Sequence, residues 1–406
     1  MIRSLLPVCL ILLLSGTSCN VLKLSKLLKK GSTSEESFRE QIPFEYRMDL
    51  VIIPVVINGK TYEFMVDTGA PNVVSKELAA ELGKKTVVSQ RVGDSQGESS
   101  RLDFILLDTV SIGGLDYVNT AAAIADLKQS NMIACLKVDG FIGANLMRKA
   151  IWEFDYEHQL ITMVSSREQL SIPSDAAVLP FVPAASGTPK VSVQYNGHRE
   201  DFLTFDTGAN GHFTSTDRVY QLLKETNDSL RTIYGIGQNT SGLFGQAGHD
   251  TTDYAIVSVK AGDLPPIEQV VSFKKEQSKL MGTAFLKNFR VIIDWPLKEI
   301  LLIPSAQPET ARLEGFGFTI SRSKDNHLLT SFIYHGSHAE KLGMEIGDRI
   351  IRIDSIDFSI LTDDSWCELV YNGTGGAGAK SIEVTILKGE EQRSFRLDKQ
   401  VLLGTR

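Results

Sequence analysis

The sequence predicts a mainly β protein, in which two similar β-barrel-like lobes are followed by a small α+β barrel. Three observations support this fold class. The tetrapeptide Asp-Thr-Gly-Ala occurs twice, at Asp67 to Ala70 and at Asp206 to Ala209. The residues around each copy repeat with matched spacing, and the pattern changes beyond Pro304. A chain of 406 residues also exceeds what one hydrophobic core usually organises.

A turn signal precedes each tetrapeptide. Asn58-Gly59 and Asn196-Gly197 are flanked by strand-like residues, which is the pattern of a tight β-hairpin turn. An apolar run then leads directly into Asp67 in the first half and into Asp206 in the second. Each acidic residue is therefore expected at the end of a hairpin strand.

The repeat continues downstream of each tetrapeptide. An apolar-apolar-glycine segment ends 76 residues after each acid, at Gly143 (143 − 67) and at Gly282 (282 − 206). Two copies of one folding unit explain this agreement. Lobe 1 is expected at residues 44–165 and lobe 2 at residues 173–305.

The segment between each acid and its glycine is expected to hold a short helix and then a hairpin. The helices should begin near Ser75 and Ser215, which can act as N-caps. The hairpins, which could cover a cleft, are expected at Gly93 to Gly97 and at Gly235 to Gln238. The first stretch also fits the Gly-x-Ser-x-Gly pattern of serine hydrolases, which makes Ser95 an alternative nucleophile. Its polar flanks favour a hairpin tip instead.

At these residues the chain resembles the pepsin-like and retropepsin-like aspartic proteases, whose two lobes each carry an Asp-Thr-Gly loop and an apolar-apolar-glycine loop. The resemblance covers about residues 46–305 and implies a single-chain, bilobal aspartic protease fold. It also implies that Asp67 and Asp206 are the catalytic residues of an aspartic endopeptidase acting on a peptide or protein substrate. The supporting loop residues that it implies are Thr68, Gly69, Thr207 and Gly208.

Two carboxyl groups that share one proton can hydrolyse a peptide bond without a metal ion or cofactor. The ionised carboxylate takes a proton from a bound water, and the protonated carboxyl supplies one to the scissile carbonyl. Crowding raises one pKa, because like charges a few Å apart cannot both form easily. Which aspartate is acid and which is base stays open. Two alternatives remain: each Asp is a strand-end turn residue, or the chain is a non-catalytic peptide-binding protein on a protease scaffold.

The C-terminal region is expected to be a separate module at residues 313–400, after a polar linker at Ser305 to Thr310. Its start resembles the carboxylate-binding loop of PDZ domains, where backbone N–H groups bind the C-terminal carboxylate of a peptide. The resemblance implies that protein C-termini are possible partners and that Thr362 to Tyr371 is a groove-lining helix. A small barrel that binds no peptide is the alternative. The peptide-binding residues implied are Gly315, Phe316, Gly317 and Phe318.

The N-terminus has the composition of an export signal. Arg3 precedes a short apolar run, and small residues then lead to Cys19. Residues 1–18 are interpreted as a signal peptide. Its resemblance to bacterial lipoprotein signals implies lipidation of Cys19 and an exported, membrane-anchored protein of the bacterial cell envelope. Simple cleavage and release is the alternative, because Gly16 stands where such signals usually carry Leu. Residues 19–43 are expected to be a tether, with the folded protein beginning near Phe44.

Charge and cysteine positions limit the remaining functions. A net charge of −7 gives no reason to expect a nucleic-acid partner. His335 and His338 have a metal-like spacing, but they lie in a loop without a neighbouring cysteine, so no metal site is expected. Cys135 and Cys367 are far apart and belong to different expected domains. A disulfide framework is therefore not expected.

Overall fold

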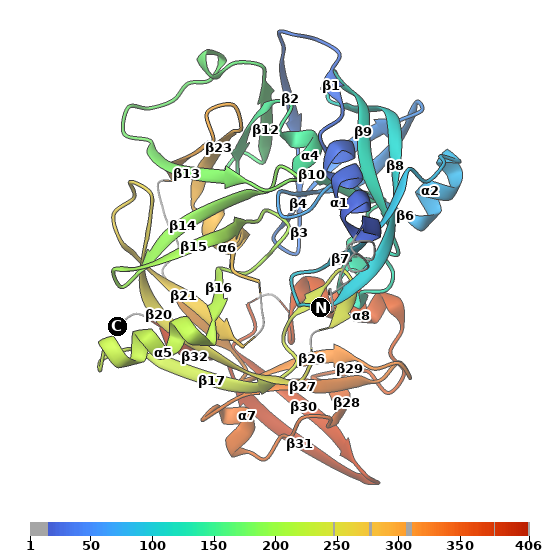
Figure 1. The fold of residues 1–406 in the computed structure, drawn as a ribbon. Coiled ribbons are helices and arrows are strands. Elements are labelled where there is room, and N and C mark those ends of the chain that lie inside the picture. Colours follow the sequence, from blue (N-terminus) through green and yellow to red (C-terminus); the bar gives the residue numbers. More distant parts are fainter. Residues whose placement is uncertain (1–14, 247, 276–277, 306–310, 377, 405–406) are drawn as a thin grey trace, which may run out of the picture.

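The computed structural model describes residues 15–246, 248–275, 278–305, 311–376 and 378–404. Strands dominate these residues, which confirms the mainly β fold class. Two lobes lie side by side in Figure 1, lobe 1 in blue to cyan and lobe 2 in green to gold. The C-terminal residues, in orange and red, lie below both lobes in that view.

Lobe 1 is a sheet that closes on itself. Its pairings run β4–β5–β10–β6–β9–β8 and return from β8 to β4. The predicted turn between β4 and β5 is confirmed, because Asn58 and Gly59 have positive φ angles of 52° and 78°. The elements are β3 (Glu45–Arg47), β4 (Leu50–Ile57), β5 (Lys60–Asp67), β6 (Val73–Ser75), α2 (Lys76–Leu82), β7 (Val88–Gly93), β8 (Ser99–Ile112), β9 (Leu115–Ala125), α3 (Asn131–Leu136), β10 (Gly140–Gly143) and α4 (Ala144–Met147).

Lobe 2 repeats the same circuit. Its pairings run β14–β15–β22–β16–β21–β20 and return from β20 to β14. Asn196 and Gly197 form the matching turn, with φ angles of 48° and 86°. The elements are β14 (Pro189–Tyr195), β15 (His198–Phe205), β16 (Phe213–Thr216), α5 (Asp217–Thr226), β17 (Thr232–Gly237), β18 (Ser241–Gly242), β19 (Gly245–Gln246), β20 (Asp250–Ala261), β21 (Ile267–Lys274), β22 (Leu280–Met281) and α6 (Thr283–Leu286).

The two predicted helices follow the tetrapeptides, with one difference at the caps. Ser75 caps α2, since its side chain accepts a hydrogen bond from the Leu78 N–H, as expected. The N-cap of α5 is Thr216, not Ser215. Ser215 is a fully buried residue of strand β16, so the prediction was wrong by one position.

A six-stranded sheet joins the lobes, in the order β2–β12–β11–β23–β24–β13. Its central pair brings Trp152 beside Ile293, and both side chains are fully buried in the core that the lobes share. Each lobe contributes one hairpin and one outer strand. The elements are β2 (Arg39–Pro43), β11 (Ile151–Asp155), β12 (Leu160–Val164), the 3₁₀ turn η1 (Arg167–Gln169), β13 (Ala177–Pro183), β23 (Phe289–Asp294) and β24 (Glu299–Pro304).

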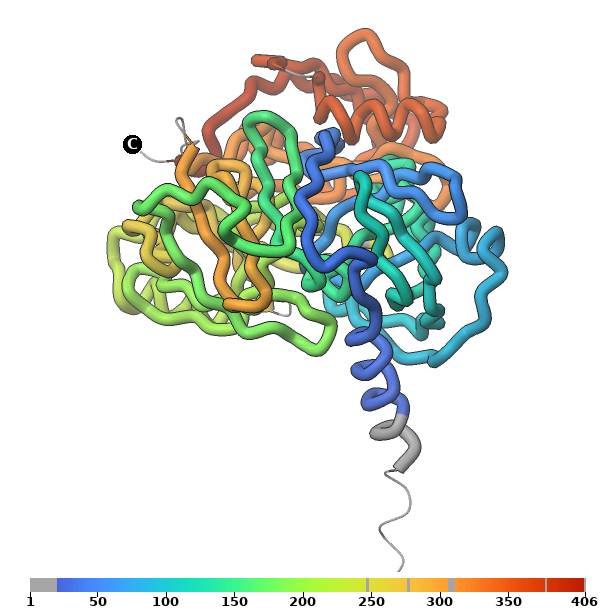
Figure 2. The backbone as a smooth tube through the Cα atoms, turned by 90° about the horizontal axis from the view of Figure 1, so that it is seen from above, coloured from blue at the N-terminus to red at the C-terminus, as the bar shows by residue number. Residues whose placement is uncertain are grey.

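The expected tether at residues 19–43 is wrong for its described structure. Helix α1 (Ser15–Leu28) packs its last turn on lobe 1 through the buried side chains of Leu27 and Leu28. β1 (Ser32–Thr33) pairs with β9, and β2 belongs to the interlobe sheet. The folded body therefore begins before Phe44. β2 is the outer strand on the lobe 1 side of the interlobe sheet, as β13 is on the lobe 2 side. Figure 2 shows the blue part of α1 projecting from the body.

The start of the expected signal peptide, residues 1–14, lies outside the described residues. The backbone of Cys19 lies within α1. Among the described residues, no helix has the length and apolar content needed to cross a membrane.

The C-terminal domain has a core of its own, which includes Phe318, Ile350, Trp366 and Val384. The expected helix is confirmed as α8, which Thr362 caps. Most of the linker, residues 306–310, lies outside the described residues. The elements are β25 (Arg312–Gly315), β26 (Phe318–Arg322), β27 (Leu328–Tyr334), α7 (His338–Lys341), β28 (Arg349–Ile353), β29 (Ile356–Asp357), α8 (Asp363–Asn372), β30 (Ser381–Lys388), β31 (Glu391–Asp398) and β32 (Gln400–Gly404).

The C-terminal domain is attached to both lobes. Strand β27 pairs with β17 of lobe 2, which extends one sheet across the domain boundary. On the lobe 1 side, α8 packs against α3, and the Trp366 indole N–H donates to the Asn131 carbonyl at 3.2 Å. Cys135 of α3 and Cys367 of α8 form a disulfide. The expectation that these cysteines stay unpaired is therefore wrong, because domain docking brings together residues that are 232 positions apart.

Removing this disulfide is expected to loosen the C-terminal domain. A cross-link that closes a long loop stabilises a protein by roughly 2–5 kcal/mol, mainly by restricting the unfolded chain. Cys367→Ser should therefore lower the unfolding temperature of the oxidised protein, and adding a reductant to the wild type should have the same effect. Melting curves with and without reductant measure this. Free thiols at Cys135 and Cys367 in the oxidised wild type, located by alkylation and mass spectrometry, or equal melting temperatures, would contradict the pairing.

Candidate active site

The two predicted acids lie where equivalent strands end: Asp67 is the last residue of β5, and Asp206 directly follows β15. Asp67, the last residue of β5, pairs with Gly143 of the parallel strand β10. In lobe 2 the Asp206 N–H donates to the Met281 carbonyl at 2.9 Å, next to Gly282. A Cβ at Gly143 would lie 2.1 Å from the Pro71 carbonyl carbon. The glycine at this position is thus required by the close approach of the tetrapeptide loop.

Hydrogen bonds between Thr68 and Thr207 hold the two acidic loops together. The Thr68 N–H donates to Thr207 Oγ1 at 3.0 Å, and the Thr207 N–H donates to Thr68 Oγ1 at 3.0 Å. Each hydroxyl in turn donates across the lobe boundary, Thr68 to the Phe205 carbonyl at 2.6 Å and Thr207 to the Val66 carbonyl at 2.9 Å. Both threonines are fully buried. Four bonds related by approximate two-fold symmetry therefore fix one loop relative to the other.

Gly69 and Gly208 allow each loop to lie against the opposite carboxyl group. A Cβ at Gly69 would lie 2.6 Å from Asp206 Oδ2, and one at Gly208 would lie 2.4 Å from Asp67 Cγ. Real Cβ atoms do not approach other atoms this closely, so only glycine fits at both positions. The two carboxyl groups are hydrogen-bonded to each other. The structure thus brings Asp67 and Asp206 together as one dyad.

The two carboxyl groups differ in their backbone support. Asp67 Oδ1 accepts hydrogen bonds from the Gly69 N–H at 2.8 Å and the Ala70 N–H at 3.1 Å. Asp206 Oδ1 accepts one, from the Gly208 N–H at 2.9 Å. Backbone donors favour the ionised form of a carboxyl group. Asp67 is therefore the better supported as a carboxylate.

Burial raises the pKa of both acids. It raises the pKa of Asp67 to about 6, against the lowering effect of the hydrogen bonds from Gly69 and Ala70. The pKa of Asp206 lies well above its ordinary value, because burial and the negative charge of Asp67 both disfavour its ionisation. The pair therefore titrates in two steps, and the singly protonated dyad exists over a pH range that begins near pH 6.

Each lobe has a hairpin in the segment between its acid and its glycine, and the two hairpins contact each other. The β7–β8 tip, at Asp94 to Gly97, is the predicted lobe 1 hairpin. In lobe 2 the residues Gly235 to Gly237 lie in strand β17, and the turn follows them, so that part of the prediction was misplaced. Thr240 Oγ1 donates to Gln96 Oε1 at 2.7 Å, and the Phe244 N–H donates to Asp94 Oδ2 at 3.1 Å. The hairpins thus contact each other across the lobe boundary.

Ser95 lies in the β7–β8 turn. Its Oγ accepts a hydrogen bond from the Gln96 side-chain amide at 3.2 Å, and its carbonyl accepts one from the Ser278 N–H. A hydrolase nucleophile elbow requires a strand–turn–helix segment. A hairpin between two antiparallel strands lacks that geometry.

The predicted peptide-binding loop links β25 to β26. Gly317 has φ = 90°, and its carbonyl accepts hydrogen bonds from the Tyr334 N–H at 3.0 Å and from Ser337 Oγ at 3.2 Å. Helix α8 lies beside β26, because Arg322 at the end of β26 forms a 2.6 Å ion pair with Asp363 at the start of α8. This ion pair places the start of α8 beside the end of β26.

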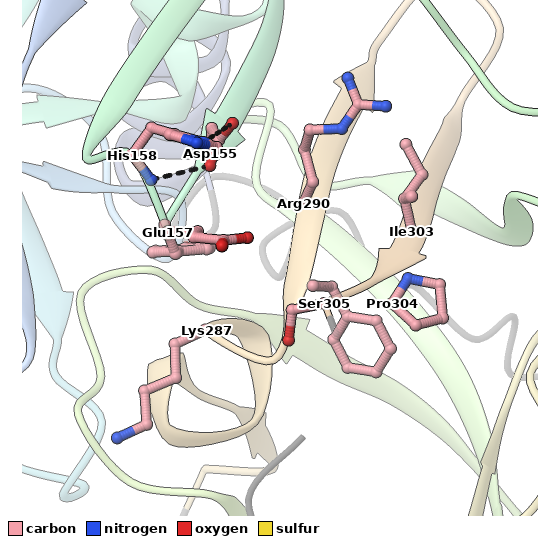
Figure 3. A pocket seen from close by; sticks show the side chains of 10 residues that line it. Asp155, Glu157, His158, Lys287, Arg290, Ile303, Pro304 and Ser305 are labelled. Atoms are coloured by element: carbon pink, nitrogen blue, oxygen red, sulfur yellow. Dashed lines mark hydrogen bonds and ion pairs between the residues drawn. The ribbon is translucent and has the colours of Figure 1, made fainter. Parts of the chain in front are cut away.

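A different hollow, of about 210 Å³, opens at one end of the interlobe sheet (Figure 3). It contains the contact between His158 Nδ1 and Asp155 Oδ2 at 2.9 Å, and Lys287 and Arg290 also line it. Neither dyad residue does. This hollow is therefore separate from the candidate active site.

Comparisons with known proteins agree with the geometry of lobe 1. Residues 53–146 match the family model of the aspartyl proteases, a segment that contains Asp67, Thr68 and Gly69 but not Asp206. A solved structure, a retropepsin-like aspartic protease from Rickettsia conorii, is 22% identical over 33% of this chain and 94% of that chain, with a TM-score of 0.23. That score is too low to support an argument. No curated protein matches the chain.

Proposed function

We propose that the chain is an aspartic endopeptidase that hydrolyses peptide bonds with Asp67 and Asp206. The observation that carries this proposal is the dyad itself: two carboxyl groups in hydrogen-bonding contact, on equivalent loops of two lobes, with Asp206 buried and Asp67 partly exposed. A turn residue would need neither the threonine bonds nor the paired glycines. The match of residues 53–146 to the aspartyl proteases supports the same function.

The asymmetry of the dyad assigns the starting roles. Asp67, with two backbone donors and the lower pKa, is the carboxylate that takes a proton from the attacking water. Asp206 holds the shared proton and donates it to the scissile carbonyl oxygen. A tetrahedral intermediate then forms from the water oxygen and the carbonyl carbon. Its collapse breaks the C–N bond: Asp67 gives the proton that it took from water to the leaving nitrogen, and a hydroxyl proton of the intermediate returns to Asp206, which restores the starting dyad.

Cleavage is expected to be most rapid at mildly acidic to neutral pH. The active, singly protonated dyad forms as Asp67 ionises, so kcat/KM should rise as pH increases through about 6. It should fall again when Asp206 loses its proton at a higher pH. A pH–rate profile with a fluorogenic peptide measures both limbs.

Ala70→Ser and Ala209→Ser provide matched variants for this profile. A hydroxyl at either position could donate a hydrogen bond to the ionised carboxylate, which lowers its pKa. Ala70→Ser should then move the acidic limb, which Asp67 controls, to lower pH. Ala209→Ser should move the alkaline limb, which Asp206 controls, to lower pH. A wild-type optimum in strong acid would show that burial does not control the dyad as described.

We also propose that the C-terminal domain is a PDZ-like module that binds a peptide C-terminus between β26 and α8. The loop Gly315-Phe316-Gly317-Phe318 would supply the N–H donors for the carboxylate. Fluorescence anisotropy of labelled peptides with the full chain tests this: a peptide with a free C-terminus should bind more tightly than its C-terminal amide. Equal affinities, or binding to neither, would support the alternative of a barrel that only packs on the lobes.

Export and membrane anchoring complete the proposal. The composition of residues 1–18 supports export, and lipidation of Cys19 would anchor the protein in the bacterial cell envelope. Metabolic labelling with a fatty acid should mark the wild type and not Cys19→Ser. Labelling of neither protein, with release of both from the cells, would support simple cleavage.

A further inference from the structure

One lysine lies beside the dyad in lobe 2. Lys190 of β14 pairs with Thr204 of β15, and its Nζ donates to Thr204 Oγ1 at 2.6 Å. Thr204 lies in β15, two residues before Asp206, which directly follows the strand. The positive charge of Lys190 is close enough to Asp206 to lower its pKa in part. Thr188, two residues before Lys190, also contacts the lobe 1 loop, since its hydroxyl donates to the Gly69 carbonyl at 3.4 Å.

The equivalent positions of lobe 1 are apolar. Ile52 of β4 pairs with Met65 of β5, which precedes Asp67 by two residues just as Thr204 precedes Asp206. Both side chains are buried in an apolar cluster with Phe141. The strand face next to the dyad is thus hydrophobic in lobe 1 but polar and cationic in lobe 2.

Among the residues that the structure describes, Lys190 forms no ion pair, and the carboxyl group that its charge acts on is that of Asp206. Its neighbour Lys279 is different, because it forms a 2.5 Å ion pair with Glu200. Lys190 is half-buried. It also lines a hollow of about 370 Å³ together with Ser192, Arg199 and Lys260, and neither dyad residue lines that hollow. Arg199 is already paired with Asp201 at 2.8 Å. A half-buried ammonium group that donates one hydrogen bond to a hydroxyl has further N–H donors, so it can still bind an anionic group.

We propose that Lys190 is a specificity-determining residue, which makes the enzyme select substrates with an aspartate or glutamate at one position near the scissile bond. The inference rests on the proposed endopeptidase function and deepens it. The ammonium group would donate a charge-assisted hydrogen bond to the substrate carboxylate, the stronger kind of hydrogen bond. The apolar face around Ile52 and Met65 would favour a hydrophobic side chain on the other side.

The test compares matched peptides with Glu or Gln at a single position, which is moved one residue at a time along an otherwise constant sequence. At one position the wild type should cleave the Glu peptide about tenfold faster in kcat/KM than the Gln peptide, because only the carboxylate is anionic. Lys190→Met should bring that ratio close to one, and Lys190→Glu should reverse it. Lys260→Met removes a charge from the same hollow farther along the sheet and should leave the ratio unchanged.

Peptide binding to an inactive variant tests this inference independently of the proposed protease activity. Asp206→Asn should bind a non-hydrolysable Glu peptide about tenfold more tightly than its Gln counterpart, and adding Lys190→Met should abolish the difference. Equal binding and equal cleavage of Glu and Gln peptides at every position would overturn the inference, even if the protein is an active protease. A uniform rate change in Lys190→Met for all peptides would show that the lysine acts on the dyad alone, which also overturns it.

Discussion

Asp67→Asn and Asp206→Asn are each expected to abolish peptide cleavage, with kcat/KM at least about a thousandfold lower than in the wild type. Asparagine keeps the shape of the side chain and can still accept the bond from the Gly69 or Gly208 N–H. It can neither take nor supply the shared proton. Initial rates on one fluorogenic peptide, measured for both variants, test the prediction.

Two controls accompany these variants: the melting temperature of Asp206→Asn and the activity of Ser95→Ala. The folded-state pKa of Asp206 is raised, so its ionisation removes stability as pH rises from its unfolded pKa through its folded one. Asp206→Asn cannot ionise and should therefore melt at a higher temperature than the wild type at pH 7, with the difference vanishing in acid. Ser95→Ala should retain most activity. If its loss equalled that of the Asp variants, a serine mechanism would replace the dyad.

Gly208→Ala is expected to remove nearly all activity while leaving the fold largely intact. The added methyl carbon would lie 2.4 Å from Asp67 Cγ, so either the carboxyl group or the loop must move. Shifts of about 1 Å in catalytic groups commonly reduce rates about a hundredfold.

Gly211→Ala is the matched control for Gly208→Ala. It lies on the same loop, its φ is not in the left-handed region, and a Cβ there would meet nothing within 4 Å. It should keep near-normal kcat/KM. Wild-type activity in Gly208→Ala, or equal losses in both variants, would contradict the close packing of the loop against Asp67.

The dyad and its supports could be predicted from sequence because their signals are local. Two Asn-Gly turns, two tetrapeptides and two distant glycines are short motifs, and the duplication supplies an internal comparison. The structure places Thr68 and Thr207 in mutual contact, as the resemblance implied.

Features that depend on distant contacts were not predictable in the same way. Strand β2 is short and polar on one side, and only its pairing with β12 makes it part of the fold. The Cys135–Cys367 disulfide depends on how the C-terminal domain docks, which no local pattern specifies. Lys190 was missed because it is notable only in comparison with Ile52, the equivalent residue of lobe 1. The register of the two hairpins is needed to identify that equivalence.

The central claim is that the two acids form one catalytic dyad, and peptide hydrolysis tests it most directly. The purified protein would be incubated near pH 6 with a mixed peptide library, with and without an active-site-directed aspartic protease inhibitor, and the products identified by mass spectrometry. We expect internal cleavage that the inhibitor suppresses and that Asp206→Asn lacks. Intact peptides after incubation with the folded wild type across the range from pH 4 to 8, or cleavage that persists in Asp206→Asn, would contradict it.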